Sequence, residues 1–409
     1  MLYPFQLPLL LDGATGTNLI AAGLPQGACV EAWILEHPEP LSSLQRAFAA
    51  AGSDAVYAPT FSANRAKLDH FGLAEKVTEM NTRLVSLSRE AAPGKLIGGD
   101  LSPTGLFVEP FGDTTFSELK DIYYEQGLAL KEAGVDFIIA ETMMSLAEAR
   151  AAVIATRKLG LPIFVTMTVD EKGRTLTGAS ALSCLVCLQE LGVSAFGLNC
   201  SYGPEKMAKL IAEIAPFAKV PLIAKPNAGQ PHADRPDEYD LTPDQTADAM
   251  RLCLDAGAQI IGGCCGSTPA HIAEMRRLLN GYDFQSVSVL PDAHDLVLAN
   301  EQQVFLLDED RIETTEPIAC TVDMADDLLD AEEDSFDVLL IEVHTPDDAY
   351  QFNQNARMAR LPVMFYSDDE LALKTALLLY NGRALVDSKS SLPDEVLEEI
   401  AFKYGAVVY

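Results

Sequence analysis

The sequence predicts an α/β protein, a (β/α)8 TIM barrel followed by a smaller α/β domain. Short apolar runs alternate with amphipathic helical segments along the first two thirds of the chain, and several of these segments end in a glycine just before the next run. Chemically distinctive polar residues follow the runs, where the strands of a barrel lead into its functional loops. These three observations together predict the barrel.

The expected strands and helices follow one another in a regular order. The expected strands are, in chain order, 9–11, 55–58, 96–99, 137–140, 163–167, 195–198, 222–224 and 259–262. The expected helices are 40–51, 73–92, 116–133, 145–159, 181–191, 205–218 and 243–256. Gly52, Gly134, Gly192 and Gly257 follow helical segments, and glycine there supplies the left-handed conformation that ends a helix. An open doubly wound sheet is the alternative, although no Gly-x-Gly-x-x-Gly follows the first strand.

A second region follows the barrel. A chain of 409 residues should hold more than one core, because single cores stop growing near roughly 250–300 residues. We place the barrel at 1–282 and a small acidic α/β domain at 289–409. The apolar runs of the second region lie at 304–307, 338–342, 363–365, 384–386 and 406–408.

The charge of the chain argues against polyanionic partners. The net charge is −31, and residues 284–409 carry 27 acidic and 7 basic side chains, a balance of −20. Such a surface repels nucleic acid phosphates and anionic membranes, so we expect neither as a partner. No apolar run approaches the roughly 20 residues of a membrane helix, and the N-terminus does not resemble a signal peptide. We therefore expect a cytoplasmic protein with reduced cysteines.

Polar residues with functional chemistry follow the expected strands. Active sites of (β/α)8 barrels lie where the strands run into the following loops, so these residues are candidates for the site. In strand order they are Asp12 with Gly13, Thr60, Asp100, Glu141, Asn199 with Cys200, Lys225, and Cys264 with Cys265. The cysteines that follow two different strands therefore converge on one end of the barrel.

The adjacent residues Cys264 and Cys265 lie between Gly263 and Gly266. Both thiolates can reach one soft metal ion if the backbone turns sharply, and the glycines permit such a turn. Together with Cys200 they predict a three-thiolate zinc site with an open fourth position, the pattern of a catalytic zinc. The alternative is a pair of small buried residues at a strand end.

Two other features carry less weight. Cys184-x-x-Cys187 has redox or zinc spacing but belongs to an apolar helical segment, where we expect ordinary packing. The loop 227–239 is rich in Pro, Gly and Asp, and is either a lid over the mouth of the barrel or a plain surface loop.

Five motifs carry a resemblance to a known family. They are Leu-Asp-Gly-Ala-Thr-Gly-Thr at 11–17, Thr-Phe-Ser-Ala-Asn at 60–64, Glu-Thr at 141–142, Gly-Leu-Asn-Cys-Ser at 197–201 and Gly-Gly-Cys-Cys-Gly at 262–266. With these motifs, residues 1–282 resemble the zinc-dependent homocysteine S-methyltransferases, which include the homocysteine-binding module of cobalamin-dependent methionine synthase. The family usually has Asn before the threonine of the second motif, where this chain has Pro59.

The resemblance implies roles for individual residues. Cys200, Cys264 and Cys265 would hold Zn2+ and form the catalytic centre. Asp12 and Glu141 would hold the ammonium group of homocysteine, the backbone at Gly13 and Ala14 would lie near its carboxylate, and Thr60 and Asn199 would complete the substrate contacts. The chemistry agrees, because a free thiol with a pKa near 8.5 is mostly protonated at pH 7, and zinc coordination deprotonates it.

The second region resembles about half of the pterin-binding module of methionine synthase. The similar stretches lie at 336–342, 361–367, 380–388 and 403–408. The aspartate expected after the third strand is replaced around Ser367, and the opening Gly-Glu-Arg-x-Asn is missing, which implies weak methyltetrahydrofolate binding by this region alone. The region could pair with a second subunit, cover the barrel, dock a corrinoid protein, or be structural. No Asp-x-His-x-x-Gly segment is present, so cobalamin would be carried by a separate protein.

These observations favour an enzyme that moves a methyl group to the thiol of L-homocysteine, giving methionine. The expected donor is a methyl-corrinoid partner protein or a methyltetrahydrofolate system; the alternative is direct use of S-methylmethionine, S-adenosylmethionine or betaine. A related thiol or selenol could replace homocysteine as the acceptor. A hypothesis of a different class is a non-catalytic assembly subunit that holds zinc structurally.

Overall fold

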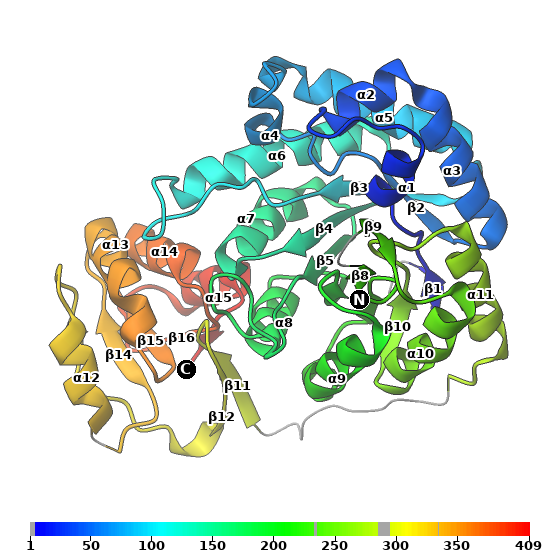
Figure 1. The fold of residues 1–409 in the computed structure, drawn as a ribbon. Coiled ribbons are helices and arrows are strands. Elements are labelled where there is room, and N and C mark those ends of the chain that lie inside the picture. Colours follow the sequence, from blue (N-terminus) through cyan, green and yellow to red (C-terminus); the bar gives the residue numbers. More distant parts are fainter. Residues whose placement is uncertain (1–4, 233–234, 285–294, 334) are drawn as a thin grey trace.

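The computed structural model describes residues 5–232, 235–284, 295–333 and 335–409. Eight parallel strands form one sheet in the order β1-β10-β7-β6-β5-β4-β3-β2 (Figure 1). All eight expected strands are present, as β1 Leu9–Leu10, β2 Ala55–Ala58, β3 Leu96–Leu101, β4 Phe137–Met143, β5 Ile163–Met167, β6 Ala195–Asn199, β7 Leu222–Lys225 and β10 Ala258–Ile261.

The first and last strands of this order meet and close the sheet into a barrel. The Asp54 N–H, just before β2, donates to the Leu10 carbonyl at 2.7 Å, and the Leu10 N–H donates to Asp54 Oδ2 at 2.8 Å. Arg276 holds the same carboxylate at 2.6 Å from the outer helix that ends the barrel. The closed barrel is therefore confirmed, and the open doubly wound alternative is wrong.

The interior of the barrel is filled by alternate residues of its strands. Successive residues of a strand point to opposite faces, so every second side chain enters the lumen. The buried interior cluster consists of Leu9, Leu11, Ala55, Tyr57, Phe137, Ile139, Phe164, Ala195, Ile223 and Ile260. The Phe5 ring, just before β1, packs edge-on against Phe137 and Phe164 and fills the amino-terminal end of the barrel. The polar groups are thereby left at the opposite end.

The expected helices surround the barrel (Figure 1). They are α3 Pro38–Ala51, α5 Val77–Ala91, α6 Phe116–Ala133, α7 Leu146–Thr156, α8 Ala181–Glu190, α9 Pro204–Ile214 and α10 Pro243–Asp255, with α11 Pro269–Gly281 completing the ring. Gly52 and Gly134 take the expected left-handed conformation, with φ of 108° and 84°. Three short helices, α1 Gly16–Ala21, α2 Val30–Glu36 and α4 Arg65–Asp69, were not expected and lie in the loops after β1 and β2.

The C-terminal region contains a second parallel sheet. Its strands β13 Ile318–Ala319, β14 Leu339–Glu342, β15 Val363–Tyr366, β16 Leu385–Val386 and β17 Val407–Val408 pair in sequence order. Its helices are α12 Ala325–Glu333, α13 Pro346–Asn355, α14 Glu370–Leu379 and α15 Asp394–Tyr404. The apolar run at 304–307 lies outside this sheet, because β12 Val304–Asp308 pairs with β11 Asp295–Ala299 in an antiparallel hairpin.

The two faces of this second sheet are covered differently. The β11–β12 hairpin packs on one face through Leu298, which joins Val338, Leu340, Met364 and Leu385 in one cluster. Residues of the other face belong to the same large core as α7 and α8 of the barrel. The predicted boundary between 282 and 289 falls after α11, and residues 285–294 lie outside the described part. No helix in the described ranges is both long and apolar enough to cross a bilayer.

Candidate functional site

The structure brings the three predicted cysteines together at the carboxyl ends of β6 and β10. The sulfur atoms of Cys200, Cys264 and Cys265 all lie within 4.8 Å of one another. Tetrahedral zinc with bonds of about 2.3 Å to sulfur places its thiolates roughly 3.8 Å apart. The cluster therefore fits a soft metal ion after only a small contraction.

The backbone after β6 is bent to aim Cys200 into this cluster. Cys200 and its neighbour Ser201 have φ of 62° and 58°, in the left-handed region that residues other than glycine rarely adopt. The Cys200 N–H donates to the Lys225 carbonyl at 3.1 Å, and the Cys264 N–H donates to the Pro226 carbonyl at 2.8 Å. The backbone at the end of β7 therefore fixes the positions of both segments that carry the cysteines.

The glycines of the Cys264–Cys265 turn are required by close neighbours. A Cβ on Gly263 would lie 2.3 Å from Ser267 Oγ. That hydroxyl donates to the Cys264 carbonyl at 2.6 Å and accepts from the Ala14 N–H at 3.0 Å. The turn is thus tied to the segment after β1, in which the resemblance places the binding of the substrate carboxylate.

The close approach of the three sulfurs shifts their proton affinities in opposite directions. Hydrogen bonds from the thiols of Cys264 and Cys265 hold the pKa of Cys200 well below its usual range. The same proximity raises the pKa of Cys264 and Cys265. A divalent cation at the centre would relieve this crowding of negative charge, as expected for metal-binding cysteines.

Asn199 links the cysteine cluster to the end of β4. Its Nδ2 donates to Thr142 Oγ1 at 2.7 Å and lies 3.8 Å from Cys264 Sγ, while its Oδ1 accepts from the Thr142 N–H at 2.9 Å. Thr142 is a second left-handed position at the site, with φ of 59°. Asn199 was predicted to contact substrate; in the structure, its amide group hydrogen-bonds to Thr142 and holds the end of β4 next to the cysteine cluster.

Asp12 and Glu141 meet at the mouth of the barrel, but around a lysine. Lys225 Nζ lies 3.1 Å from Glu141 Oε2 and 3.9 Å from Asp12 Oδ1, and its ammonium lies 3.8 Å from the centre of the Tyr57 ring. Asp12 Oδ2 accepts from the Tyr57 N–H at 2.8 Å. Burial raises the pKa of Asp12 to about 7, against the opposing attraction of Lys225.

Asp100 adds a third carboxylate to this group. Thr60 Oγ1 donates to the Asp100 carbonyl at 2.9 Å and lies 3.0 Å from the Asp100 N–H, so the hydroxyl predicted to contact substrate is engaged with β3. Burial and the nearby Glu141 raise the pKa of the Asp100 carboxyl. Asp100 and Lys225 were identified only as strand-end residues, without a role, and Tyr57 was not singled out at all.

Tyr239 is a further site residue that sequence reasoning missed. It ends β9 Arg235–Tyr239, which pairs with β8 Pro231–His232 inside the loop that follows β7. Its hydroxyl interacts with the sulfur of Cys265, and a Cβ on Gly266 would lie 2.3 Å from its ring. The available signal was the loop itself, whose Tyr239 end contacts the Cys264–Cys265 turn. The lid interpretation of the loop stays a prediction.

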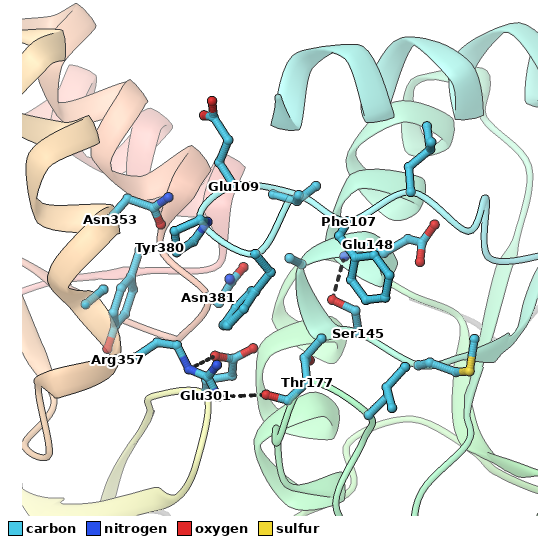
Figure 2. Close-up of a pocket in the computed structure, with 18 of the residues that line it drawn as sticks. Phe107, Glu109, Ser145, Glu148, Thr177, Glu301, Asn353, Arg357, Tyr380 and Asn381 are labelled. Atoms are coloured by element: carbon cyan, nitrogen blue, oxygen red, sulfur yellow. Dashed lines mark hydrogen bonds and ion pairs between the residues drawn. The ribbon is translucent and has the colours of Figure 1, made fainter. Parts of the chain in front are cut away.

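A separate cavity lies between the barrel and the C-terminal region (Figure 2). Phe107, Thr177, Glu301, Arg357 and Asn381 are among its lining residues. None of the predicted site residues lines it, and Arg357 is already paired with Glu301 at 3.5 Å and stacked on Phe111. Among the described residues, none of the buried side-chain polar atoms without a hydrogen-bond partner lines this cavity, whereas those of Asp12, Tyr57, Asp100 and Asn227 lie at the barrel mouth. The barrel mouth is therefore the candidate site.

Fold and site together define a (β/α)8 barrel enzyme whose functional groups are clustered thiols and carboxylates at the carboxyl ends of its strands. Residues 9–279 match the family described as homocysteine S-methyltransferase, and the chain belongs to this family. The resemblance predicted for residues 1–282 and the predicted enzyme class are thereby confirmed. The likeness of the second region to a pterin-binding module stays a prediction.

Two methionine synthases are similar to this chain, one from Mycobacterium tuberculosis and one from Mycobacterium leprae. Each is 31% identical over 285 residues, which are 64% of this chain but only 24% of the relative. Among solved structures, the Escherichia coli homocysteine methyltransferase MmuM in its oxidized and metallated forms matches with a TM-score of 0.57 at 24% identity. These matches cover 66% of this chain and 95% of MmuM, and they show the barrel fold.

Proposed function

We propose that this protein transfers a methyl group to the thiol of L-homocysteine, giving methionine, with zinc held by Cys200, Cys264 and Cys265. The observation that carries the proposal is the three-thiol cluster at the same barrel mouth as the carboxyl groups of Asp12 and Glu141. Membership of the homocysteine S-methyltransferase family supports it, and so does the metallated form of the similar E. coli enzyme.

The residues of the chain divide the work of binding between them. The carboxylates of Asp12 and Glu141 bind the substrate ammonium, and the three cysteines face its sulfur. Ala14 already donates its N–H to Ser267, which leaves the Gly13 N–H, unpaired among the described residues, for the substrate carboxylate. Tyr239 packs against Gly266 beside the cysteines.

The chemical step needs no general base from the chain. A bound zinc ion would lower the pKa of the homocysteine thiol and supply it as a thiolate at pH 7. The sulfur then forms a bond to the methyl carbon while the bond from that carbon to the donor breaks, and the donor keeps the electron pair. The role of the chain is to align sulfur and donor, which can contribute several kcal/mol.

For the donor, we propose a methyl-corrinoid protein, acting alone or as part of a methyltetrahydrofolate system. The similarity to methionine synthases supports this choice, although the chain spans only about a quarter of their length. The remaining candidates are S-methylmethionine, S-adenosylmethionine and betaine, used directly.

The test combines a metal measurement with a donor assay. Purified protein should contain about one zinc ion per chain and form methionine from homocysteine with at least one of methylcobalamin, S-methylmethionine, S-adenosylmethionine or betaine. Cys265→Ala should lose the metal and the activity, whereas Cys29→Ala, a partly exposed cysteine outside the cluster, should keep both. Full activity of Cys265→Ala would contradict the metal mechanism.

The non-catalytic alternative makes a different prediction about the metal. A structural zinc keeps four protein ligands, whereas a catalytic zinc exchanges its fourth ligand for substrate. X-ray absorption spectra of the zinc protein should therefore show an additional sulfur neighbour after homocysteine is added. An unchanged spectrum at saturating homocysteine would favour an assembly subunit.

A further inference from the structure

Lys225 occupies the place in the barrel mouth where a substrate ammonium is expected. Its side chain is only 3% exposed, and its Nζ lies 3.1 Å from Glu141 Oε2 and 3.9 Å from Asp12 Oδ1. The ammonium also lies over the Tyr57 ring, which favours a cation at this point. The chain thus supplies a cation of its own to the carboxylates proposed to bind the ligand.

The surrounding carboxylates have more accepting capacity than Lys225 uses. Asp12, Asp100 and Glu141 place three carboxyl groups around this single ammonium. Among the described residues, Asp12 Oδ1 and Asp100 Oδ1 accept no hydrogen bond although both are buried. A buried carboxylate oxygen without a donor is unfavourable, so the group is prepared to accept another N–H donor with a positive charge.

We propose that Lys225 is an internal counter-ion and the residue that determines specificity in the amino-acid subsite: the substrate ammonium replaces it on Glu141. The inference rests on the proposed function, because it takes the ligand to be homocysteine or methionine. A sulfur compound without an amino group cannot make this exchange and leaves Lys225 on Glu141. The subsite therefore selects thiols that carry an ammonium group.

The exchange predicts the direction in which a substitution changes affinity. Lys225 and the incoming ammonium carry the same charge and compete for the same carboxylates, so Lys225 weakens amino-acid binding relative to an uncharged side chain. Lys225→Met keeps an unbranched apolar stem against Tyr57 and removes the charge. Lys225→Arg keeps the charge, and Lys206→Met removes an exposed lysine that pairs with Glu171 and contacts neither Asp12 nor Glu141 in any hydrogen bond or ion pair of the described residues.

The experiment measures the binding of three ligands by calorimetry. L-Methionine carries the ammonium and carboxylate of homocysteine without its thiol, so its binding does not require the metal. 3-(Methylthio)propylamine carries only the ammonium, and 4-(methylthio)butanoate carries only the carboxylate. Lys225→Met should bind L-methionine and the amine about tenfold more tightly than the unaltered protein, and the butanoate no more tightly. Lys225→Arg, which keeps the charge, should bind neither L-methionine nor the amine more tightly than the unaltered protein. Lys206→Met should change the binding of all three ligands by less than about twofold.

The outcomes separate this inference from the proposed function. If L-methionine binds neither protein, the proposed function fails. If it binds Lys225→Met equally or more weakly than the unaltered protein, the ammonium exchange is wrong and Lys225 instead supports the ligand. If Lys225→Met does not fold, as judged by circular dichroism, Lys225→Gln replaces it: this variant also removes the charge, so tighter binding supports the exchange and equal or weaker binding overturns it.

Discussion

Unusual backbone conformations are concentrated at the candidate site. Among the described residues, Thr142, Cys200 and Ser201 are the non-glycine positions with positive φ. Thr142 lies near the carboxyl end of β4, and Cys200 and Ser201 directly follow β6. Each such position costs on the order of 1–3 kcal/mol and persists only where its surroundings hold it in place. Here the hydrogen bonds between Asn199 and Thr142 hold the first position, and the bond from the Cys200 N–H to the Lys225 carbonyl holds the second. This backbone conformation directs the Cys200 side chain toward the other two cysteines.

A substitution at Gly266 tests whether Tyr239 covers the cysteines. Its φ is 78°, and a Cβ would lie 2.3 Å from the Tyr239 ring. Gly266→Ala should therefore lower the free energy of unfolding by about 1–3 kcal/mol and displace Tyr239. Labelling of the metal-free protein with a thiol reagent should become faster at Cys265.

The matched control is Gly281→Ala at the end of α11, where an added Cβ meets no atom within 4 Å. Its stability and labelling rate should stay close to those of the unaltered protein. Equal labelling rates for both variants would show that Tyr239 does not cover Cys265.

The buried Asp12 predicts a pH-dependent stability. Its pKa is about 7 in the folded protein against an ordinary value of 3.8, so the folded state binds a proton more tightly than the unfolded chain. This stabilisation is fully present below pH 3.8 and is lost as the pH rises to about 7. Asp12→Asn carries no such proton, so its free energy of unfolding should rise relative to that of the unaltered protein between pH 4 and 7, by about 1.4 kcal/mol for each unit of pKa shift. Asp121→Asn, at an exposed site, should show a constant difference.

Residue type and position after an apolar run were sufficient to place Cys200, Cys264, Cys265, Asp12 and Glu141 at the same end of the barrel. All five residues directly follow apolar runs: Asp12, Cys200, Cys264 and Cys265 come after their strands, and Glu141 lies near the end of β4. The pairing of Lys225 with Glu141 could not be predicted, because it depends on the distance across the barrel between β7 and β4. Tyr239 was missed for a similar reason, since its contact with Cys265 depends on the path of a long loop.

At the scale of elements, helix α7 joins the barrel to the C-terminal region. All 11 of its residues are buried. Burial on every side of a helix requires a second layer over its outer face, and here the C-terminal region provides that layer. Arg150 of α7 donates to the carbonyls of Leu377 and Leu378 at 2.9 and 3.1 Å, and to Asn381 Oδ1 at 3.2 Å. These carbonyls belong to the last turn of α14, where a helix lacks internal donors and favours a cation.

Arg150→Met should separate these elements. Burial lowers the pKa of Arg150 to about 10, so the guanidinium is charged at pH 7 and the carbonyls depend on it. Removing it leaves them unpaired, and we expect a loss of about 2–4 kcal/mol in urea unfolding together with faster proteolysis within α14. Arg83→Met, which loses only an exposed pair with Glu79, should unfold like the unaltered protein. Equal urea midpoints for the two variants would contradict the role of Arg150.

At the scale of the whole molecule, the barrel and the C-terminal region share one core. Val153 and Leu185 of the barrel belong to the same buried cluster as Leu339 and Leu377 of the second region. The expected division at 282/289 separates the two regions along the chain, but their side chains pack in one core. Apolar runs in a sequence show where strands lie, and they do not show which helix faces another region covers. The solved chain of E. coli MmuM, which shares the barrel fold, is matched over 95% of its length by 66% of this chain.

A chain shortened to residues 1–284 should therefore aggregate, although it contains all the strands and helices of the barrel. Deletion of the C-terminal region exposes the outer face of α7 and leaves the Arg150 guanidinium without its three acceptors. Exposed apolar patches of this kind promote association, so the shortened chain should elute as aggregates in size-exclusion chromatography, whereas the full chain should unfold in a single transition. Co-expression of residues 289–409 as a second chain should restore a soluble complex, because the interface reforms without a covalent link. A shortened chain that elutes as a monomer and melts at the temperature of the full chain would show that the C-terminal region does not stabilise the barrel.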